Sequence, residues 1–147
     1  ISRRDVFKLA AAVPAAAGVS ALLAAAAEAA PLGILLDYSA GVLSAEAIKA
    51  SGAAGAIRYV SDRRPGADWM LGKPMQLAEA RDLQENGLTV VSCYQFGKQA
   101  TADWLGGQDA GVDHAKRGAQ LHTAAGGPDS APIYASIDDN PSFEQYK

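Results

Sequence analysis

The sequence predicts an α/β protein, specifically the N-terminal fragment of a (β/α) TIM-type barrel with about four βα units. Three observations support this prediction. Apolar runs typical of strands alternate with helical patterns, and the first and third runs are apolar enough for burial on both faces. No glycine-rich phosphate-binding loop follows the first run, although the alternative architecture, a doubly wound sheet, would favour one.

Four short runs have the composition of strands, because they are rich in β-branched or aromatic residues and are bounded by Gly, Pro or polar clusters. They span residues 33–38, 56–60, 88–94 and 132–137. The loops after the second and third runs are the longest. In a (β/α) barrel the functional residues lie at the carboxyl ends of the strands, so these loops are expected to overhang the site.

Helical patterns separate the runs. The expected helices span residues 44–50, 74–86 and 110–125, and a fourth begins at Asn140 and Pro141. Ser44 can cap the first helix, and Gly52 can end it. Gly87 follows the end of the second helix in the same way.

The N-terminus predicts export. An apolar, alanine-rich stretch follows the twin-arginine pair Arg3-Arg4 and ends in Ala27-Glu28-Ala29, a cleavage site with two small residues. Pro, Gly and Ser interrupt the stretch, which argues against the alternative, a retained transmembrane anchor. The predicted domains are a twin-arginine signal peptide at 1–29 and the N-terminal half of a barrel at 30–147, a piece of a longer protein. The expected location is extracellular or in the cell envelope, with membrane contact only during export.

Composition excludes several partners. The formal net charge is −3 and the longest basic cluster is Arg63-Arg64, so nucleic acid is not an expected partner. The single Cys93 rules out an internal disulfide, and we expect it to be a small buried residue. His114 and His122 are too far apart to share a metal and are expected on helix surfaces. The sequence implies no metal or organic cofactor.

Carboxylates and tyrosines gather at the predicted strand ends. Carboxylates there can act as general acid, general base or nucleophile, and aromatic rings can stack on sugar faces. The candidates are Asp37, Tyr38, Tyr59, Tyr94, Asp138, Asp139 and Asn140, together with Trp69 and Trp104 in the long loops. The alternatives are helix capping for Asp139 and Asn140, packing for the tyrosines, and loop anchoring for the tryptophans.

Several ungapped stretches, among them GILLDYSAGV, GAIRYVSDRRPG and APIYASIDDNPSFEQYK, resemble a known family. This is the twin-arginine-exported glycoside-hydrolase-like family of actinobacterial cell envelopes, a former domain of unknown function related to the family-25 lysozymes. The resemblance covers essentially the whole chain. It implies an incomplete TIM-type barrel whose partner and substrate is the glycan of cell-wall peptidoglycan.

The resemblance also implies catalytic positions. In the lysozymes, an Asp on the first strand and an Asp-x-Glu closing the fourth strand form the catalytic group. Asp37 matches the first position and Asp138 the second, but the Glu position falls on Asn140, which cannot titrate. Either Asp139 takes that role, or a carboxylate arrives from further strands, or hydrolysis has been lost.

The leading hypothesis is therefore a glycoside hydrolase-like protein acting on peptidoglycan. Asp138 is the expected main catalytic carboxylate, Asp37 supports it, and Asp139 is the substitute acid. The expected sugar-binding residues are Tyr38, Tyr59, Tyr94, Trp104 and Asn140. The main alternative is a catalytically inactive glycan-binding barrel; a metal-dependent enzyme on another envelope polymer, such as a deacetylase, is a weaker one.

Overall fold

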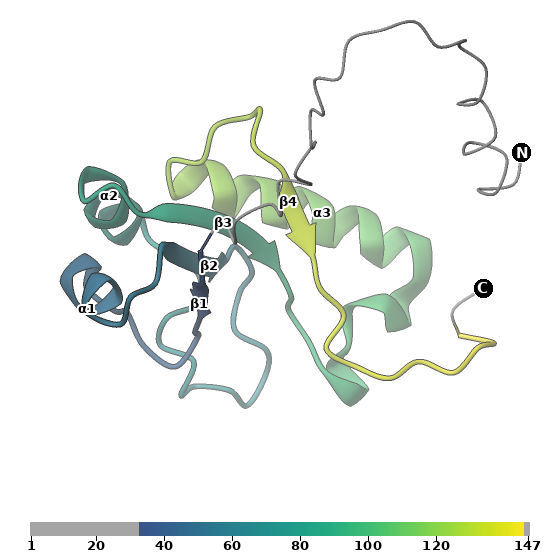
Figure 1. Cartoon of the computed structure of the whole chain (residues 1–147). Helices are drawn as coiled ribbons and strands as arrows, with labels where there is room; N and C mark the ends of the chain where they lie inside the picture. Colours follow the sequence, from purple (N-terminus) through teal and green to yellow (C-terminus); the bar gives the residue numbers. More distant parts are fainter. Residues whose placement is uncertain (1–32, 146–147) are drawn as a thin grey trace, which may run out of the picture. The chain divides into compact units, whose positions relative to one another are not determined.

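The computed structural model describes residues 33–145 (Figure 1). In chain order its elements are β1 (Leu35–Asp37), α1 (Ala45–Ala50), β2 (Gly55–Tyr59), α2 (Leu77–Glu85), β3 (Thr89–Tyr94), the 3-10 helices η1 (Gln99–Thr101) and η2 (Asp103–Gly106), α3 (Gly107–Ala124) and β4 (Ile133–Ala135). The signal peptide predicted at residues 1–29 lies outside the described residues.

The four strands form one parallel sheet in the order β1-β2-β3-β4. Asp37 pairs with Ile57 across β1 and β2, and Tyr59, Cys93 and Tyr134 are in register across β2, β3 and β4. Strands that are neighbours in sequence are therefore neighbours in the sheet. In a doubly wound sheet, by contrast, the strand order reverses at a switch point, so some consecutive strands are not neighbours. The predicted alternation of parallel strands with helices is confirmed.

The helices pack against one face of the sheet, and two apolar clusters fill the space between. The first cluster joins α1 and α2 to the sheet through buried Ile48, Ala56 and Leu83. The second joins α2 and α3 to the sheet, with Leu121 and Ile133 packed against its buried residues. Burying one such Leu or Ile stabilises a protein by about 1.5–3 kcal/mol, so these clusters hold the helices in place. Figure 1 shows α1 and α2 side by side.

Local sequence signals set the ends of α1. The Ser44 hydroxyl accepts a hydrogen bond from the backbone N–H of Ala47 at 3.2 Å, which confirms the predicted cap. Glu46 in the first turn and Lys49 in the last turn complement the helix dipole. Gly52 then turns the chain with a φ of +80°, a conformation that favours glycine.

α3 contacts the sheet closely through a glycine. The helix begins at Gly107, ahead of the predicted start at Ala110, because η2 leads directly into it. Gly118 is buried on the side that faces β3, and a Cβ there would lie 2.7 Å from Cδ2 of Tyr94. The missing side chain therefore allows the helix to approach the Tyr94 ring.

A surface ion pair joins α3 to the chain just after β2. The guanidinium of Arg117 donates two hydrogen bonds to the carboxylate of Asp62, at 2.7 and 2.9 Å. These bonds hold the pKa of Asp62 below its usual value. The paired side chains remain 46% and 42% exposed, so the pair is a surface contact.

The fourth helix predicted to begin at Asn140 and Pro141 is absent from the described residues. Only a turn lies there, closed by a 3.0 Å hydrogen bond from the Gln145 N–H to the Ser142 carbonyl. The Asp139 carboxylate accepts from the backbone N–H of Asn140 at 2.9 Å, so it caps no helix. One isolated turn does not offset the cost of nucleating a helix, which explains the difference.

Candidate active site

Strand alternation divides the predicted site residues between the two faces of the sheet. Successive side chains along a strand point to opposite faces. Tyr38 and Tyr94 contact residues of α2 and α3 and therefore belong to the face that carries the helices. Asp37 and Tyr59 contact each other on the opposite face. These four residues, all predicted to belong to one site, thus lie in two different environments.

Asp37 and Tyr59 form a hydrogen-bonded pair at the ends of β1 and β2. The Tyr59 hydroxyl lies 3.1 Å from Oδ2 of Asp37 and donates to it. Burial raises the pKa of Tyr59, and the hydrogen bond to Asp37 and the charge of that carboxylate raise it further. The phenol therefore stays protonated at neutral pH and remains a donor that orients the carboxylate.

Asp138 joins this pair from the end of β4. Its charge also contributes to the raised pKa of Tyr59. Its Oδ2 lies 3.3 Å from Nζ of Lys98, and the Lys98 and Asp138 side chains are 44% and 52% exposed. The structure thus brings Asp37 and Asp138, the two carboxylates predicted to be central, to the surroundings of one tyrosine.

A cavity of about 260 Å³, here called the strand-end cavity, opens at this edge of the sheet. It is lined by residues that end or follow each of the four strands and by residues of the long segment 60–76. The lining residues are Ser39, Tyr59, Arg64, Trp69, Met70, Lys73, Gln95, Lys98 and Asp138. The location agrees with the position of functional sites at the carboxyl ends of parallel strands.

Lys73 forms the buried wall of the strand-end cavity. Its residue surface is only 3% exposed. The ammonium group donates to the backbone carbonyl of Gln95 and lies 4.4 Å from the centre of the Tyr59 ring. Burial lowers the pKa of Lys73, while the negative charge of Asp103 opposes that shift. A desolvated cation therefore lies against the same tyrosine that orients Asp37.

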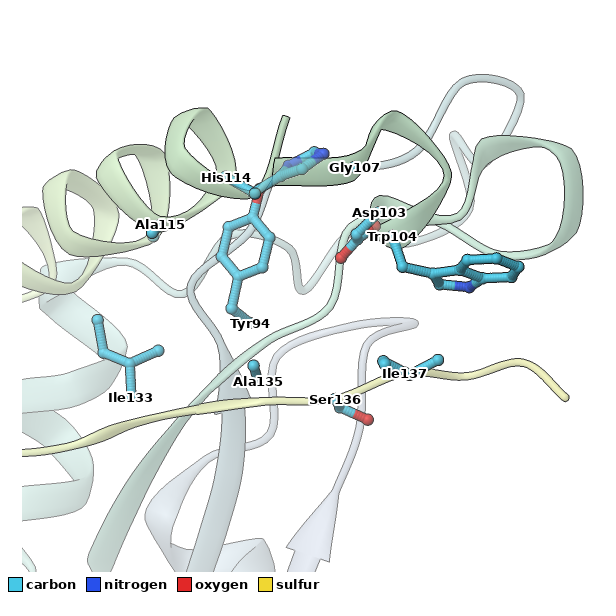
Figure 2. Close-up of a pocket in the computed structure, with 12 residues that line it drawn as sticks. Tyr94, Asp103, Trp104, Gly107, His114, Ala115, Ile133, Ala135, Ser136 and Ile137 are labelled. Carbon is cyan, nitrogen blue, oxygen red and sulfur yellow. The ribbon is translucent and has the colours of Figure 1, made fainter. Parts of the chain in front are cut away.

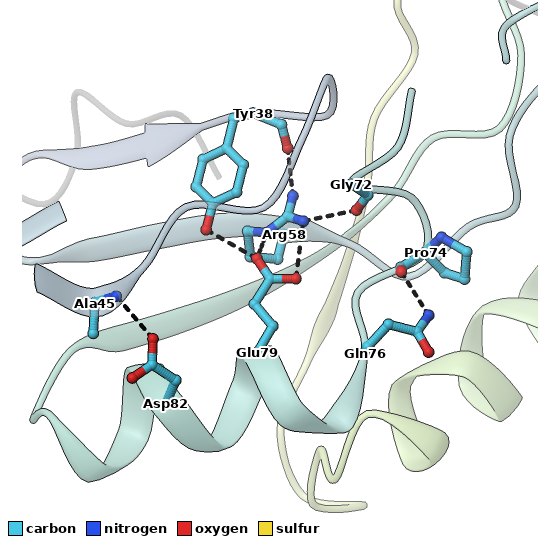
Figure 3. Close-up of polar contacts among 8 residues, drawn as sticks. All are labelled: Tyr38, Ala45, Arg58, Gly72, Pro74, Gln76, Glu79 and Asp82. Atoms are coloured by element: carbon cyan, nitrogen blue, oxygen red, sulfur yellow. Dashed lines mark hydrogen bonds and ion pairs between the residues drawn. The ribbon is translucent and has the colours of Figure 1, made fainter. Parts of the chain in front are cut away.

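Tyr38 belongs to a buried polar network on the helix side of the sheet (Figure 3). Its hydroxyl donates to Oε1 of Glu79 at 3.0 Å, and the Arg58 guanidinium lies 4.0 Å from its ring centre. Arg58 pairs with Glu79 at 2.6 Å and donates to the carbonyls of Tyr38 and Gly72. Burial raises the pKa of Tyr38 to about 12. Its hydroxyl is therefore engaged in holding α2 on the sheet and does not face the strand-end cavity.

Tyr94 and Trp104 line a second, mainly apolar pocket of about 370 Å³ between α3 and β4 (Figure 2). The Tyr94 hydroxyl lies 2.7 Å from Nδ1 of His114, and burial raises the pKa of Tyr94 to about 12. Ile133 and Ala135 of β4 form the opposite wall. Two of the predicted sugar-binding residues thus lie in a pocket separate from the one that Tyr59 and Asp138 line.

Asp139 and Asn140 lie just beyond the strand-end cavity. Both are exposed, and neither lines that cavity or the Tyr94 pocket. The bond between the Asp139 carboxylate and the Asn140 N–H is local. Asp139 and Asn140, predicted as substitute acid and sugar contact, therefore follow the cavity-lining Asp138 in sequence without lining the cavity themselves.

Sequence reasoning missed two cations of the site, Lys73 and Lys98, and left open whether Arg64 lies in a solvated loop or contacts an acidic polymer. Arg64 and Lys73 belong to the segment after β2, and Lys98 to the segment after β3. The length of these two loops was an available signal, because loops that overhang strand ends carry binding residues. Nothing in the periodicity of the sequence showed which loop side chains turn inward.

The expectation that both histidines lie on helix surfaces is wrong for His122. This residue is 6% exposed, with Nδ1 at 2.8 Å from the Ser92 hydroxyl and Nε2 at 3.1 Å from the Pro128 carbonyl. The strand and the loop each supply a polar partner, which allows the ring to be buried. His114 is half-buried against Tyr94.

Cys93 is buried, as expected, and burial raises the pKa of its thiol. Among residues 33–145, no group of three or more His, Cys, Asp or Glu side chains is placed to hold a metal ion. Within that same range, none of the helices has the length and apolar character needed to cross a membrane.

Parallel strands alternate with helices, Asp37 ends β1 and Asp138 follows β4, an arrangement that fits an α/β protein of the glycoside hydrolase-like class. The model of the Rv2525c-like, glycoside hydrolase-like domain family matches residues 46–147. The chain belongs to this family, which confirms the resemblance stated from the sequence.

One relative is the Mycobacterium tuberculosis protein Rv2525c, which carries the name of a proposed peptidoglycan hydrolase. It is 69% identical over 151 residues, an alignment that covers 100% of this chain and 63% of the relative. Two crystal structures of Rv2525c, in complex with HEPES and with L-tartrate, each match with a TM-score of 0.77 and 74% identity. Each match covers 79% of this chain and 57% of the crystallised chain.

The chain thus spans less than two thirds of the length of these relatives. Both crystal structures are of a Tat-secreted protein. The secretion route of this relative agrees with the export route predicted from Arg3 and Arg4.

Proposed function

We propose that this chain is the N-terminal part of an exported enzyme that cleaves the glycan of cell-wall peptidoglycan. In this proposal, residues 1–29 are the signal peptide, and residues 30–147 supply the first four strands of an incomplete TIM-type barrel with the helices between them. The observation that carries the proposal is the grouping of Asp37, at the end of β1, and Asp138, after β4, around Tyr59, which bonds to the first and lines the same cavity as the second. The family and the name of the M. tuberculosis relative support the choice of substrate.

Glycoside hydrolysis needs two carboxyl groups on either side of the scissile bond. One protonates the leaving oxygen, and the other stabilises or attacks the positively charged sugar carbon. We assign the main catalytic role to Asp138, which Lys98 holds at 3.3 Å. Asp37 is the supporting carboxylate, and Tyr59 orients it by donating a hydrogen bond.

The remaining predicted residues have lesser roles in this proposal. Asp139 is the substitute acid at the rim, and Asn140 is a polar contact for the sugar. Tyr59 and Trp69 supply aromatic surface within the strand-end cavity. Tyr94 and Trp104 line the neighbouring pocket and are suited to a more distant part of the polymer.

The test uses the complete exported protein, at the full length of its relatives. Purified peptidoglycan is incubated with the wild type and with Asp138→Asn, and released fragments with new reducing ends are measured by mass spectrometry. We expect release by the wild type and its loss in the variant, with glycan binding retained. Asp62→Asn is the matched control, because Asp62 is paired with Arg117 away from the cavity.

A glycan-binding protein without hydrolytic activity is the second candidate. The exposed amide of Asn140, at the position where the lysozyme pattern has Glu, favours it. In that case neither the wild type nor Asp138→Asn releases fragments, and both sediment with peptidoglycan. Release that persists in Asp138→Asn would remove Asp138 from the catalytic role while leaving the enzyme class intact.

A further inference from the structure

The strand-end cavity is positively charged although the protein as a whole is acidic. Three cations line it, Arg64, Lys73 and Lys98, and the single carboxylate among the lining residues is Asp138. The formal net charge of the chain is −3. A local excess of positive charge in an acidic protein is the arrangement expected of a site that attracts a negatively charged ligand group.

Only one of these cations has an ionic partner within the described residues. Lys98 pairs with Asp138 at 3.3 Å, whereas no carboxylate of residues 33–145 lies within 4.0 Å of the charged nitrogens of Arg64 or Lys73. The carboxylate with the strongest effect on Lys73, Asp103, accepts hydrogen bonds from the backbone N–H groups of Phe96 and Gly97. Two positive charges of the cavity are therefore available to a ligand.

Lys73 is a built part of the site and not a surface lysine. It is 3% exposed, and its ammonium is fixed by the Gln95 carbonyl and the Tyr59 ring. Of the three N–H donors of the ammonium, one is directed at Gln95. A buried cation without an anion is costly, so an anionic group that reaches it gains a strong charge-assisted hydrogen bond.

Arg64 and Trp69 in the cavity lining combine a cation with an aromatic ring. The Arg64 guanidinium lies 6.0 Å from the centre of the Trp69 ring, and Trp69 is 55% exposed. An exposed indole can stack on a sugar face while the neighbouring guanidinium binds a carboxylate. The cavity volume, about 260 Å³, is below that of pockets for drug-sized ligands, so it suits a single substituted sugar.

We propose that the strand-end cavity is a subsite for a sugar that carries a carboxylate, with Lys73 and Arg64 as the residues that bind it. In peptidoglycan, that group is the lactyl carboxylate of the muramic acid unit, in strands from which the peptide has been removed. The inference rests on the proposed action on glycan and adds a preference for acidic over neutral amino sugars. It also predicts how the glycan chain is positioned on the protein, because the acidic sugar unit occupies the cavity beside Asp138.

The test is calorimetric titration of the complete exported protein with three probes. The first is a peptide-free glycan oligosaccharide with free lactyl carboxylates, the second is the same oligosaccharide with those groups converted to methylamides, and the third is malonate. We expect the acidic oligosaccharide to bind at least about tenfold more tightly than the amide, with an affinity that falls as salt is added. Malonate is expected to bind weakly and to compete with the acidic oligosaccharide.

Two variants assign the effect to the cavity. Lys73→Met and Arg64→Gln should each reduce the affinity for the acidic oligosaccharide about tenfold and leave the affinity for the amide unchanged. Arg64 lies on the exposed loop and tests the proposal even if Lys73→Met fails to fold. Lys49→Met on α1 is the matched control, because Lys49 contacts Asn86 and does not line the cavity.

The outcomes distinguish failure of the subsite proposal from failure of the proposed glycan function. Equal affinity for the acidic and amide oligosaccharides, unchanged in both variants, would overturn the subsite and leave the glycan function standing. Malonate binding that depends on Lys73 and Arg64, with no binding of either oligosaccharide, would support a carboxylate site and refute the glycan function. Absence of binding by all three probes would refute both.

Discussion

The Tyr59 hydroxyl donates a hydrogen bond to the Asp37 carboxylate across the ends of two adjacent strands, at 3.1 Å. Buried Lys73 lies 4.4 Å from the centre of the Tyr59 ring, and Asp138 lines the same cavity. The Tyr59 side chain therefore lies between the candidate carboxylate Asp37 and the cation Lys73, and close to the second carboxylate, Asp138. The position of Asp37 depends on a side chain that itself has no acid or base role at neutral pH.

Tyr59→Phe tests this positioning role. The variant keeps the ring against Lys73 and removes the donor to Asp37, so we expect kcat on peptidoglycan to fall about tenfold or more, because a misplaced carboxylate is less effective. KM should change little. The measurement is the initial rate of reducing-end release. Tyr134→Phe, an exposed tyrosine in register on the same face, is the control; equal rates in the two variants would contradict the role.

Arg58→Met tests the buried network that holds α2 on the sheet. Arg58 and Glu79 side chains are 0% and 3% exposed, and the variant leaves the Glu79 carboxylate buried without its partner. We expect the free energy of unfolding to fall by about 3–5 kcal/mol, measured by urea denaturation. Arg117→Met, which breaks the exposed pair with Asp62, should have a far smaller effect. Similar losses in both variants would show that burial does not determine how much the Arg58–Glu79 pair contributes to the free energy of unfolding.

Gly118→Ala and Gly111→Ala form a matched pair within α3. The new Cβ at Gly118 would lie 2.7 Å from Tyr94, whereas the Cβ at Gly111 meets no atom within 4 Å. We expect Gly118→Ala to destabilise the protein by about 1–3 kcal/mol, because the helix must move away from β3. Gly111→Ala should stabilise it by about 0.5–1 kcal/mol through helix propensity. Thermal unfolding of both variants is the measurement, and a stabilising Gly118→Ala would contradict the close helix–strand contact.

The Cys93 thiol should be unreactive in the native protein. Burial and the nearby charge of Asp37 raise its pKa, so at pH 8 a smaller fraction is thiolate than in the unfolded chain. We expect iodoacetamide to modify Cys93 slowly in buffer and rapidly in denaturant. Between pH 8 and 10, the rate of Cys93 modification in the native protein should begin to rise at a higher pH than the rate in the denatured protein. Rapid modification of the folded protein at pH 8 would show that the thiol is accessible.

Much of the fold could be predicted from the sequence, because strands and helices have local signals. Ser44 and Gly52 bound α1 as expected, and the four apolar runs became four parallel strands. The faces of those strands were harder to assign. A shift of one residue moves a side chain to the other face, and Tyr38 follows Asp37 directly. Sequence reasoning therefore grouped Tyr38 with Asp37, although its hydroxyl contacts Glu79 on the helix side.

The cationic wall of the site could not be predicted in the same way. Lys73 lies in a segment without periodicity, and its burial depends on contacts with Gln95 and Tyr59 that are distant in sequence. The polar partners of His122 are likewise distant in sequence or on a loop, at Ser92 and Pro128. Such contacts arise from tertiary packing and leave no local pattern.

The segment between β2 and α2 is anchored to the scaffold along much of its length but exposes one large side chain, Trp69. Arg58 binds the Gly72 carbonyl at 2.7 Å, and the Met75 N–H donates to the Tyr59 carbonyl at 2.8 Å, so the stretch around Lys73 is part of the folded core. Trp69 remains 55% exposed. A new side chain at position 69 would therefore change the surface that the loop offers to a ligand while the backbone anchors of the loop stay in place.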